Sequence, residues 1–588
     1  MNFLETSGSM ARGFVILTLL AFAAEGNRMD WDREEWTWLI VSAGILAFIA
    51  AYGIGANDVA NAFATSVGAK AITVKQAVLF ASVFEFCGAV LMGSSVSKTI
   101  RKGIADVSCF EDNPGLLIYG MTCVILAVSV WLLVASYLEM PVSTTHSTVG
   151  GIIGMTLMSR GKDCVVWNYT KKDYGNGNTN MGFDEFPWLD GVAEIAVSWL
   201  LSPIASGICA AILYAITKYG ILVQKRSYLL ARIFFPFIVA FTAGVNTTFW
   251  IVKGTKGRPK RFRTHRYVRE SKNGALASTI EVAAIVAACC FGVALLLLIP
   301  ISKWVEAECP DEPSAKAIED DDDVEKDLAK DAEVKKGEVD DVELTIQDGS
   351  AKTLPVAPAE AQATGAVGYV TGELNKDPHA VLRQDSVVGN MHAHAARYDP
   401  KTEGFFRYVQ VFTAMVDSFS HGANDVANAM GPFAAAYVAW KKGKVEKEHD
   451  LKDNMTWILA LGGAGIVVGL ATYGYKIMTA MGVKLAAVTP SRGYCIELGA
   501  AFVIIYGTAQ GWPLSTTHCQ VGATVAVGLF EGYEGVNGKL LAKTAFGWVI
   551  TLVVVGLTTA LLVGPSPEPL KDEYCGDWCL VDNRGGCA

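Results

Sequence analysis

The chain has 588 residues, of which 52% are hydrophobic and 18% charged, whereas soluble globular domains carry roughly 25% charged residues. This composition excludes a disordered or fibrous protein, and long apolar blocks of about 20 residues indicate an integral membrane protein. The net charge of −9 comes from one segment, because Val305–Ser350 holds 18 acidic and five basic residues. No basic stripe interleaved with aromatic residues follows a helix, so nucleic acid is not an expected partner.

Residues 1–35 form an N-terminal segment before the first predicted membrane crossing. Arg12 precedes the apolar run Phe14–Ala24, a pattern typical of a signal peptide. A peripheral helix would show the same pattern, so both interpretations stay open. Either one favours a start of the first crossing on the outer side of the membrane.

Hydropathy predicts an all-α polytopic membrane protein with about twelve crossings. They fall at about 36–56, 74–97, 116–138, 141–158, 192–217, 229–250, 279–301, 408–438, 455–478, 494–511, 513–530 and 541–564. The fourth, ninth and eleventh are short enough to be re-entrant helical hairpins. Between the two groups, residues 304–404 are acidic and poor in aromatic residues, which predicts a disordered cytoplasmic loop.

Two motifs occur twice. GANDVANA stands at Gly55–Ala62 and again at Gly422–Ala429, while PVSTTH at Pro141–His146 matches PLSTTH at Pro513–His518. The first motif falls in crossings one and eight, and the second in crossings four and eleven. Because both offsets are the odd number seven, the second copy is expected to be upside down, which predicts inverted transmembrane repeats at 36–303 and 405–564.

An outside N-terminus places the acidic loop in the cytoplasm and the Cys-containing tail, residues 565–588, outside. Five cysteines would then be external. A disulfide could form between two of them, and because their number is odd at least one would be unpaired. They are Cys109, Cys164, Cys575, Cys579 and Cys587. The basic run Lys253–Lys272 would also lie outside, against the positive-inside rule.

Acidic residues inside apolar crossings are costly and indicate function. In each half one glutamate lies inside an apolar stretch between the two motifs, Glu85 in FEFCGA and Glu497 in YCIELGA, which predicts a symmetric pair. Hard cations such as sodium prefer oxygen ligands, and Gly with Asn favours a helix interruption that frees carbonyl oxygens. The predicted sodium ligands are Asn57, Asp58, Asn61, Glu85, Asn424, Asp425, Asn428 and Glu497. The competing interpretation is a close helix crossing with Asn bridging the helices.

The STTH motifs follow a proline, which is typical of a helix N-terminus. Free backbone N–H groups and the helix dipole favour an oxyanion there, and the hydroxyl groups can donate to it. The predicted phosphate-binding residues are Asp58, Ser143, Thr144, Thr145, Asp425, Ser515, Thr516 and Thr517. An ordinary N-cap is the alternative for a single copy. His146 and His518 are interpreted as packing residues rather than metal ligands.

At these motifs the chain resembles the inorganic phosphate transporter (PiT) family of sodium-coupled phosphate symporters. The resemblance covers both halves and leaves the central loop unmatched. It implies about twelve segments with two re-entrant hairpins, inward cotransport of inorganic phosphate with sodium, and no cofactor. It also implies that Asp58, Asp425, Glu85, Glu497, Ser143 and Ser515 lie beside phosphate and sodium.

The expected function is therefore sodium-coupled phosphate import by a multi-pass protein of the plasma membrane, in contact with lipid, and a homodimer is compatible with the sequence. A proton-coupled symporter, or one that carries another oxyanion such as sulfate, remains an alternative with the same fold. A membrane phosphate sensor with the acidic loop as its signalling arm is a third. No nucleophile–base pair or metal-cluster spacing indicates an enzyme.

Overall fold

A computed structural model describes residues 36–93, 104–167, 191–255, 272–309, 377–445, 455–510 and 514–564, together with Glu34, Gly372 and Asn375. The predicted signal peptide, most of the acidic loop and the C-terminal tail lie outside the described residues. So does most of the basic run Lys253–Lys272.

The described chain is helical, apart from two isolated β-bridges. The first half contains α2 (Thr37–Ile54), the π-helical turn η1 (Gly55–Val59), α3 (Ala60–Gly68), α4 (Val74–Met92), α6 (Pro114–Tyr137), α7 (Thr144–Ser159), α8 (Gly191–Thr217), α9 (Ser227–Thr255) and α10 (Lys272–Glu308). The second half contains α15 (Pro400–Lys442), α16 (Thr456–Tyr473), α17 (Tyr475–Thr479), the π-helical η9 (Ala480–Lys484), α18 (Pro490–Gln510), α19 (Thr516–Gly528) and α20 (Gly538–Val563). Every predicted crossing coincides with a helix.

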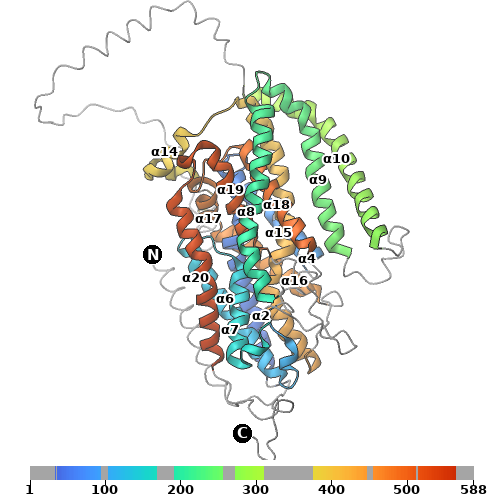
Figure 1. Ribbon diagram of the computed structural model, residues 1–588, viewed down its shortest axis with the longest axis vertical. Coiled ribbons are helices and arrows are strands. Elements are labelled where there is room, and N and C mark those ends of the chain that lie inside the picture. The colour runs from blue at the N-terminus through green and yellow to red at the C-terminus, as the bar shows by residue number, and fades with distance from the viewer. Residues whose placement is uncertain are drawn as a thin grey trace, which may run out of the picture.

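Eight helical segments of the described chain are long and apolar enough to span a membrane. They belong to α2, α4, α6, α8, α9, α10, α16 and α20, which supports a polytopic membrane protein. Helices α7, α15, α18 and α19 are not among them. Helices α7 and α19 have only 16 and 13 residues, which is too short to span, whereas α15 and α18 are long enough but carry charged residues that lower their hydropathy. Figure 1 shows α15 in the middle of the bundle and the pair α9 and α10 along one flank.

The two halves pack on each other reciprocally. A methyl group on Gly55 would lie 1.9 Å from the carbonyl oxygen of Ile466 in α16, and one on the matching Gly422 would lie 2.3 Å from that of Glu85 in α4. Glycine is required at both positions because the two backbones touch. Helix α4 of the first half therefore packs on α15, as α16 of the second half packs on α2.

The helices that carry the two octapeptides run antiparallel. Gly44 in α2 lies against Phe433 in α15, whereas Asp58, fourteen residues later, lies beside His421, twelve residues earlier than Phe433. The reciprocal packing together with this opposed direction gives the bundle an approximate twofold symmetry. This is the geometry that an inverted repeat requires.

Helices α6 and α7 form a hairpin whose two ends are tied together at its base. Ala105 pairs with Val165 in an isolated antiparallel bridge, Arg160 makes an ion pair of 2.7 Å with Asp112, and a disulfide joins Cys109 to Cys164. The disulfide links two of the five cysteines that the sequence analysis placed on one side of the membrane.

Helices α18 and α19 form a second hairpin with a similar base. Ala486 pairs with Val536, and Arg492 makes an ion pair of 2.6 Å with Glu531. A segment from before α15 docks here, because the backbone N–H of Ala396 donates to Glu531 at 2.8 Å and the Arg492 guanidinium donates to the carbonyl of Ala396 at 3.1 Å.

The docked segment corrects the predicted extent of the disordered loop. Residues 377–404 were expected to be disordered, but they form α13 (Val381–Gln384), α14 (Ser386–His394) and the first turn of α15. In α14 the side chains of Val388 and Met391 are buried against Val483, and His392 lies 2.8 Å from the Val483 carbonyl. Burial of this short apolar face stabilises these helices, which the polar composition of the segment did not indicate.

Candidate functional site

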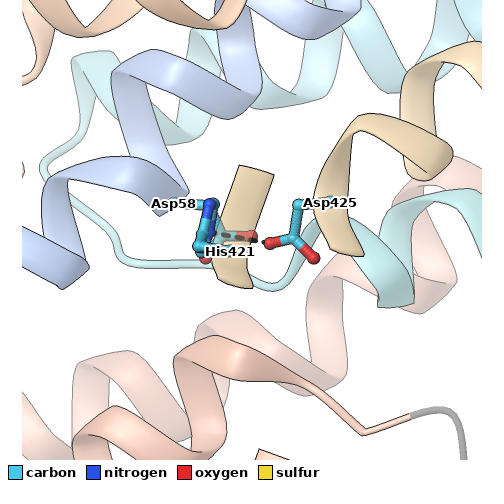
Figure 2. A group of neighbouring side chains, drawn as sticks. All are labelled: Asp58, His421 and Asp425. Atoms are coloured by element: carbon cyan, nitrogen blue, oxygen red, sulfur yellow. Dashed lines mark ion pairs between the residues drawn. The ribbon is translucent and has the colours of Figure 1, made fainter. Parts of the chain in front are cut away.

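Three buried side chains meet where the two octapeptides cross. Asp58 comes from η1, and His421 and Asp425 come from α15, one helical turn apart. One ligand atom from each lies within 4.8 Å of the others, and His421 Nε2 lies 2.8 Å from Asp425 Oδ2 (Figure 2). Exposure is 1% for both aspartates, so their charges act in a medium that screens them weakly.

The N-termini of α7 and α19 point at these aspartates. Thr144 donates to Asp58 through its backbone N–H at 3.3 Å and its hydroxyl at 2.8 Å, and Thr517 from the other half donates to the second oxygen of Asp58. Thr516 donates to Asp425 at 3.1 Å. The predicted cation and anion residues of both halves are therefore in direct contact.

Each of these helices begins at its serine, as predicted from the sequence. The hydroxyl of Ser143 accepts from the N–H of His146, and that of Ser515 accepts from the N–H of His518. The two serine hydroxyls lie 2.9 Å apart, with Ser515 donating to Ser143. The N-termini of α7 and α19 thus face each other across the approximate twofold axis.

The two motif histidines pack in equivalent positions. The Nδ1 of His146 lies 3.3 Å from the carbonyl of Trp548, and that of His518 lies 3.1 Å from the carbonyl of Trp199. Their rings contact each other and the two indoles. This agrees with the interpretation of both as packing residues.

The identical octapeptides differ in backbone. Residues Gly55–Val59 form a π-helical turn, so the predicted helix interruption occurs in the first copy. In the second copy α15 continues through the motif as a regular α-helix, and the prediction is wrong there. Because the eight residues are the same, their surroundings decide between the two conformations. π-Helical turns often occur at functional sites.

Asn57 of the first motif has different partners from the asparagines of the second motif. Asn57 donates to the Met140 carbonyl at 2.9 Å and to Ser136, and accepts from the Val142 N–H at 2.9 Å. Its amide therefore holds the turn before α7, although it was predicted to bind sodium. The side chain of Asn61 lies outside the described residues.

In the second motif both asparagines contact the site. Asn424 donates to Asp425 at 3.1 Å. Asn428 donates to the hydroxyls of Thr144 at 2.9 Å and Thr145 at 3.3 Å, and lies 3.5 Å from Asp425. This places Thr145 at the edge of the same cluster.

The two glutamates are not a symmetric pair, contrary to the prediction. Glu85 lies against Gly422, and the residue that lies against the matching Gly55 is Ile466. Glu85 accepts from Ser418 at 3.0 Å and lies 3.2 Å from His421 Nδ1, so it joins the aspartate cluster through His421. The prediction failed because it compared positions along the sequence, whereas equivalence depends on which helices pack together.

Glu497 has other partners. It accepts from Thr65 at 2.6 Å and Ser66 at 3.0 Å, both in α3, and from Thr413 in α15. Its side chain is fully buried. It forms a polar cluster beside the central one, with hydroxyl donors from both halves.

Sequence reasoning missed two buried residues of α15. His421 directly precedes the second octapeptide, where the first copy has Ile54, and Asp417 lies one turn earlier inside the same predicted crossing. With Ser420, Thr516 and Gln520 they line an enclosed cavity of about 10 Å³. An acidic residue in an apolar crossing was the signal for Asp417, and the difference between the two copies was the signal for His421.

Comparisons with known proteins agree with this architecture. Residues 54–559 match the phosphate transporter family. A phosphate-repressible phosphate permease of Neurospora crassa is 32% identical, over 90% of this chain and 98% of its own. A putative phosphate permease of Thermococcus kodakarensis is 30% identical over 89% and 97%.

A solved structure, described as the sodium-dependent phosphate transporter, shares the fold. It superposes with a TM-score of 0.62 at 27% identity and covers 90% of this chain and 98% of its own. The family match extends from the last residue of α2 into α20 and includes both copies of each motif. The chain belongs to the phosphate transporter family.

Proposed function

We propose that the protein is a sodium-coupled symporter that carries inorganic phosphate into the cytoplasm. The observation that carries this proposal is the meeting of Asp58 and Asp425, one from each half, at the opposed N-termini of α7 and α19. Carboxylate oxygens suit sodium, and hydroxyls at helix N-termini suit phosphate. The similarity to a sodium-dependent phosphate transporter of known structure supports the choice of sodium.

The charge of the site explains why the two ions would move together. Asp58, Asp425 and Glu85 surround a single imidazole, His421. With all three carboxylates ionised the cluster is negative even if His421 is protonated, so an added oxyanion is repelled. Bound cations remove that repulsion, and they also free the hydroxyls of Thr144 and Thr517 from Asp58 to donate to phosphate. Loading is then cooperative.

Phosphate binding would require the two N-termini to separate. Ser143 and Ser515 are in direct hydrogen-bond contact, and the nearby cavity of about 10 Å³ has room for about one water. We infer that the conformation described is closed at the centre. Movement of one hairpin relative to the other would open a space between their N-termini.

We further propose the membrane arrangement of an inverted repeat with about twelve segments, in which α6–α7 and α18–α19 are re-entrant hairpins entering from opposite sides. The disulfide at the base of α6–α7 supports placing that end outside the cytoplasm, because disulfides persist in oxidising compartments. The α18–α19 base then faces the cytoplasm. An importer of this kind would act in the plasma membrane. The proposal is compatible with a homodimer.

The position of His421 makes a proton-coupled phosphate symporter the second candidate. Its ring lies 2.8 Å from Asp425 and 3.2 Å from Glu85, so a proton on the ring would supply positive charge where a metal cation otherwise must. Uptake of labelled phosphate by reconstituted protein separates the two. Sodium coupling requires that uptake stops when choline replaces sodium and persists with a protonophore; the reverse result establishes proton coupling.

Substitution tests the site itself. Asp58→Asn and Asp425→Asn keep the shape of the side chain and remove its charge, so each should lower sodium-dependent uptake by roughly tenfold or more. Glu534→Gln, an exposed position in the described chain, is the matched control. Unchanged uptake and sodium dependence in both aspartate variants, with normal amounts in the membrane, would overturn the proposed site. Binding of phosphate without accumulation in vesicles would indicate a sensor instead.

A further inference from the structure

Three lysines from three different elements converge on the turn between α6 and α7. The ammonium group of Lys476 in α17 lies 5.3 Å from the centre of the Tyr137 ring. Lys543 in α20 donates to the carbonyl of Leu138 at 2.7 Å, and Lys484 in η9 lies 2.8 Å from a carboxylate oxygen of Glu139. Three successive residues, the last of α6 and the first two of the turn, thus each face one lysine.

The cluster has more positive than negative charge. Its three lysines face the single carboxylate of Glu139, whose side chain is 39% exposed, while that of Lys484 is 25% exposed. Lys484 donates to the Glu139 carboxylate at 2.8 Å, and the charges of Lys476 and Lys543 act on the same carboxylate. In this cluster the three ammonium groups therefore share one partly exposed carboxylate.

Glu139 also adopts an unusual backbone conformation. Its φ of +52° lies in the left-handed region, which is unfavourable for a residue other than glycine. The matching sequence position before the second STTH motif is Gly511. The chain keeps a strained, charged residue where glycine would fit the backbone better, which indicates a role for the charge.

The turn connects this cluster to the central site. Met140 and Val142, which bond to Asn57, lie one and three residues after Glu139, and Ser143 then caps α7. On the opposite side, η9 leads into the α18–α19 base, because the N–H of Asn537 donates to the carbonyl of Leu485. The lysines therefore lie between the aspartate site and the end of the molecule that carries the α18–α19 base.

We propose that Lys476, Lys484 and Lys543 form a second site for inorganic phosphate, used as it moves between the central site and the aqueous phase, and that Glu139 is a tethered competitor that occupies this site when phosphate is absent. The inference rests on the proposed function. Lysine ammonium groups are point-charge donors that suit a phosphate oxyanion. The carboxylate would prevent tight retention and so favour release.

The test is labelled phosphate exchange by reconstituted protein, with the phosphate concentration varied separately on each side of the membrane. Glu139→Gln removes the competitor and should lower the half-saturating phosphate concentration on the side of the α18–α19 base. Lys484→Gln and Lys543→Gln should raise it. Each change should be roughly fivefold, the effect of one unit charge about 4 Å away in water. On the opposite side the half-saturating concentration should stay the same.

Opposite effects distinguish this proposal from a simple structural tie. If the Glu139–Lys484 ion pair only held the hairpin closed, Glu139→Gln and Lys484→Gln would change exchange in the same direction and equally on both sides, and the proposal would be wrong. Lys539→Gln, one turn from Lys543 on α20 and exposed, is the control for charge loss. Equal exchange by all variants and the unmodified chain also overturns the lysine site, whereas no exchange by the unmodified chain overturns the proposed function.

Discussion

At the scale of single residues, identical motif positions have different partners. Asn57 bonds to the α6–α7 turn through both the N–H and the oxygen of its side-chain amide. Asn424, at the equivalent position of the second copy, donates to the adjacent Asp425. His421 stands where the first copy has Ile54. The two halves are therefore symmetric in packing and asymmetric in charge, with the polar residues concentrated on α15.

This difference predicts unequal effects of equal substitutions. Asn57→Ala leaves the Val142 N–H and the Met140 carbonyl of a buried turn without their partner, which should lower the free energy of unfolding by about 1–3 kcal/mol and reduce transport. Asn424→Ala, at a partly exposed position, should cost less. Thermal unfolding of the purified variants and phosphate uptake measure the two effects. Equal losses would contradict the asymmetric roles.

The sequence alone predicted the start of α7 at Ser143 and of α19 at Ser515, because N-capping depends on a few neighbouring residues. It also predicted that Asp58 and Asp425 belong to one site, because each lies in one copy of a repeated motif and symmetry brings the two copies together. It could not predict the partners of Glu85, since these depend on which helices pack side by side. Nor could it predict two backbones for one octapeptide, because only the surroundings differ.

At the scale of elements, the two hairpin bases are closed by different means. The α6–α7 base has the Cys109–Cys164 disulfide beside its ion pair. The α18–α19 base has the docked segment of α13 and α14 beside the Arg492–Glu531 pair. A covalent tie is favoured where the compartment is oxidising, and a docked segment can serve where it is not. The docked segment directly follows the acidic loop in the sequence.

Docking of α14 is testable with two adjacent valines. Val388 is fully buried, whereas Val387 is 49% exposed. Val388→Ser removes buried methyl groups and buries a hydroxyl, which should weaken docking by about 1–3 kcal/mol. Hydrogen exchange at 381–394 should then accelerate, with little change for Val387→Ser. If the rates of the two variants match that of the unmodified chain, the buried face does not hold the segment in place.

At the scale of the whole molecule, the twofold relation links the repeat to transport. Each half contributes one aspartate and one helix N-terminus to the centre, and α4 and α16 exchange partners between halves. Because equivalent motifs are seven predicted crossings apart, the sequence predicted that the two halves have opposite orientations. Helices α2 and α15 are antiparallel, as opposite orientations require. A site shared by two opposed halves can open to either side of the membrane by similar movements.

The opposed orientation makes a prediction about the two hairpin bases. Lys162→Cys, near the α6–α7 base, and Tyr533→Cys, near the α18–α19 base, both replace exposed side chains. If the bases lie on opposite sides, a maleimide that cannot cross the membrane should label the first variant in intact cells. It should label the second only after permeabilisation, in each case above the labelling of the unmodified chain. Labelling of both in intact cells would place the bases on one side, and the halves could not then alternate access to a shared site.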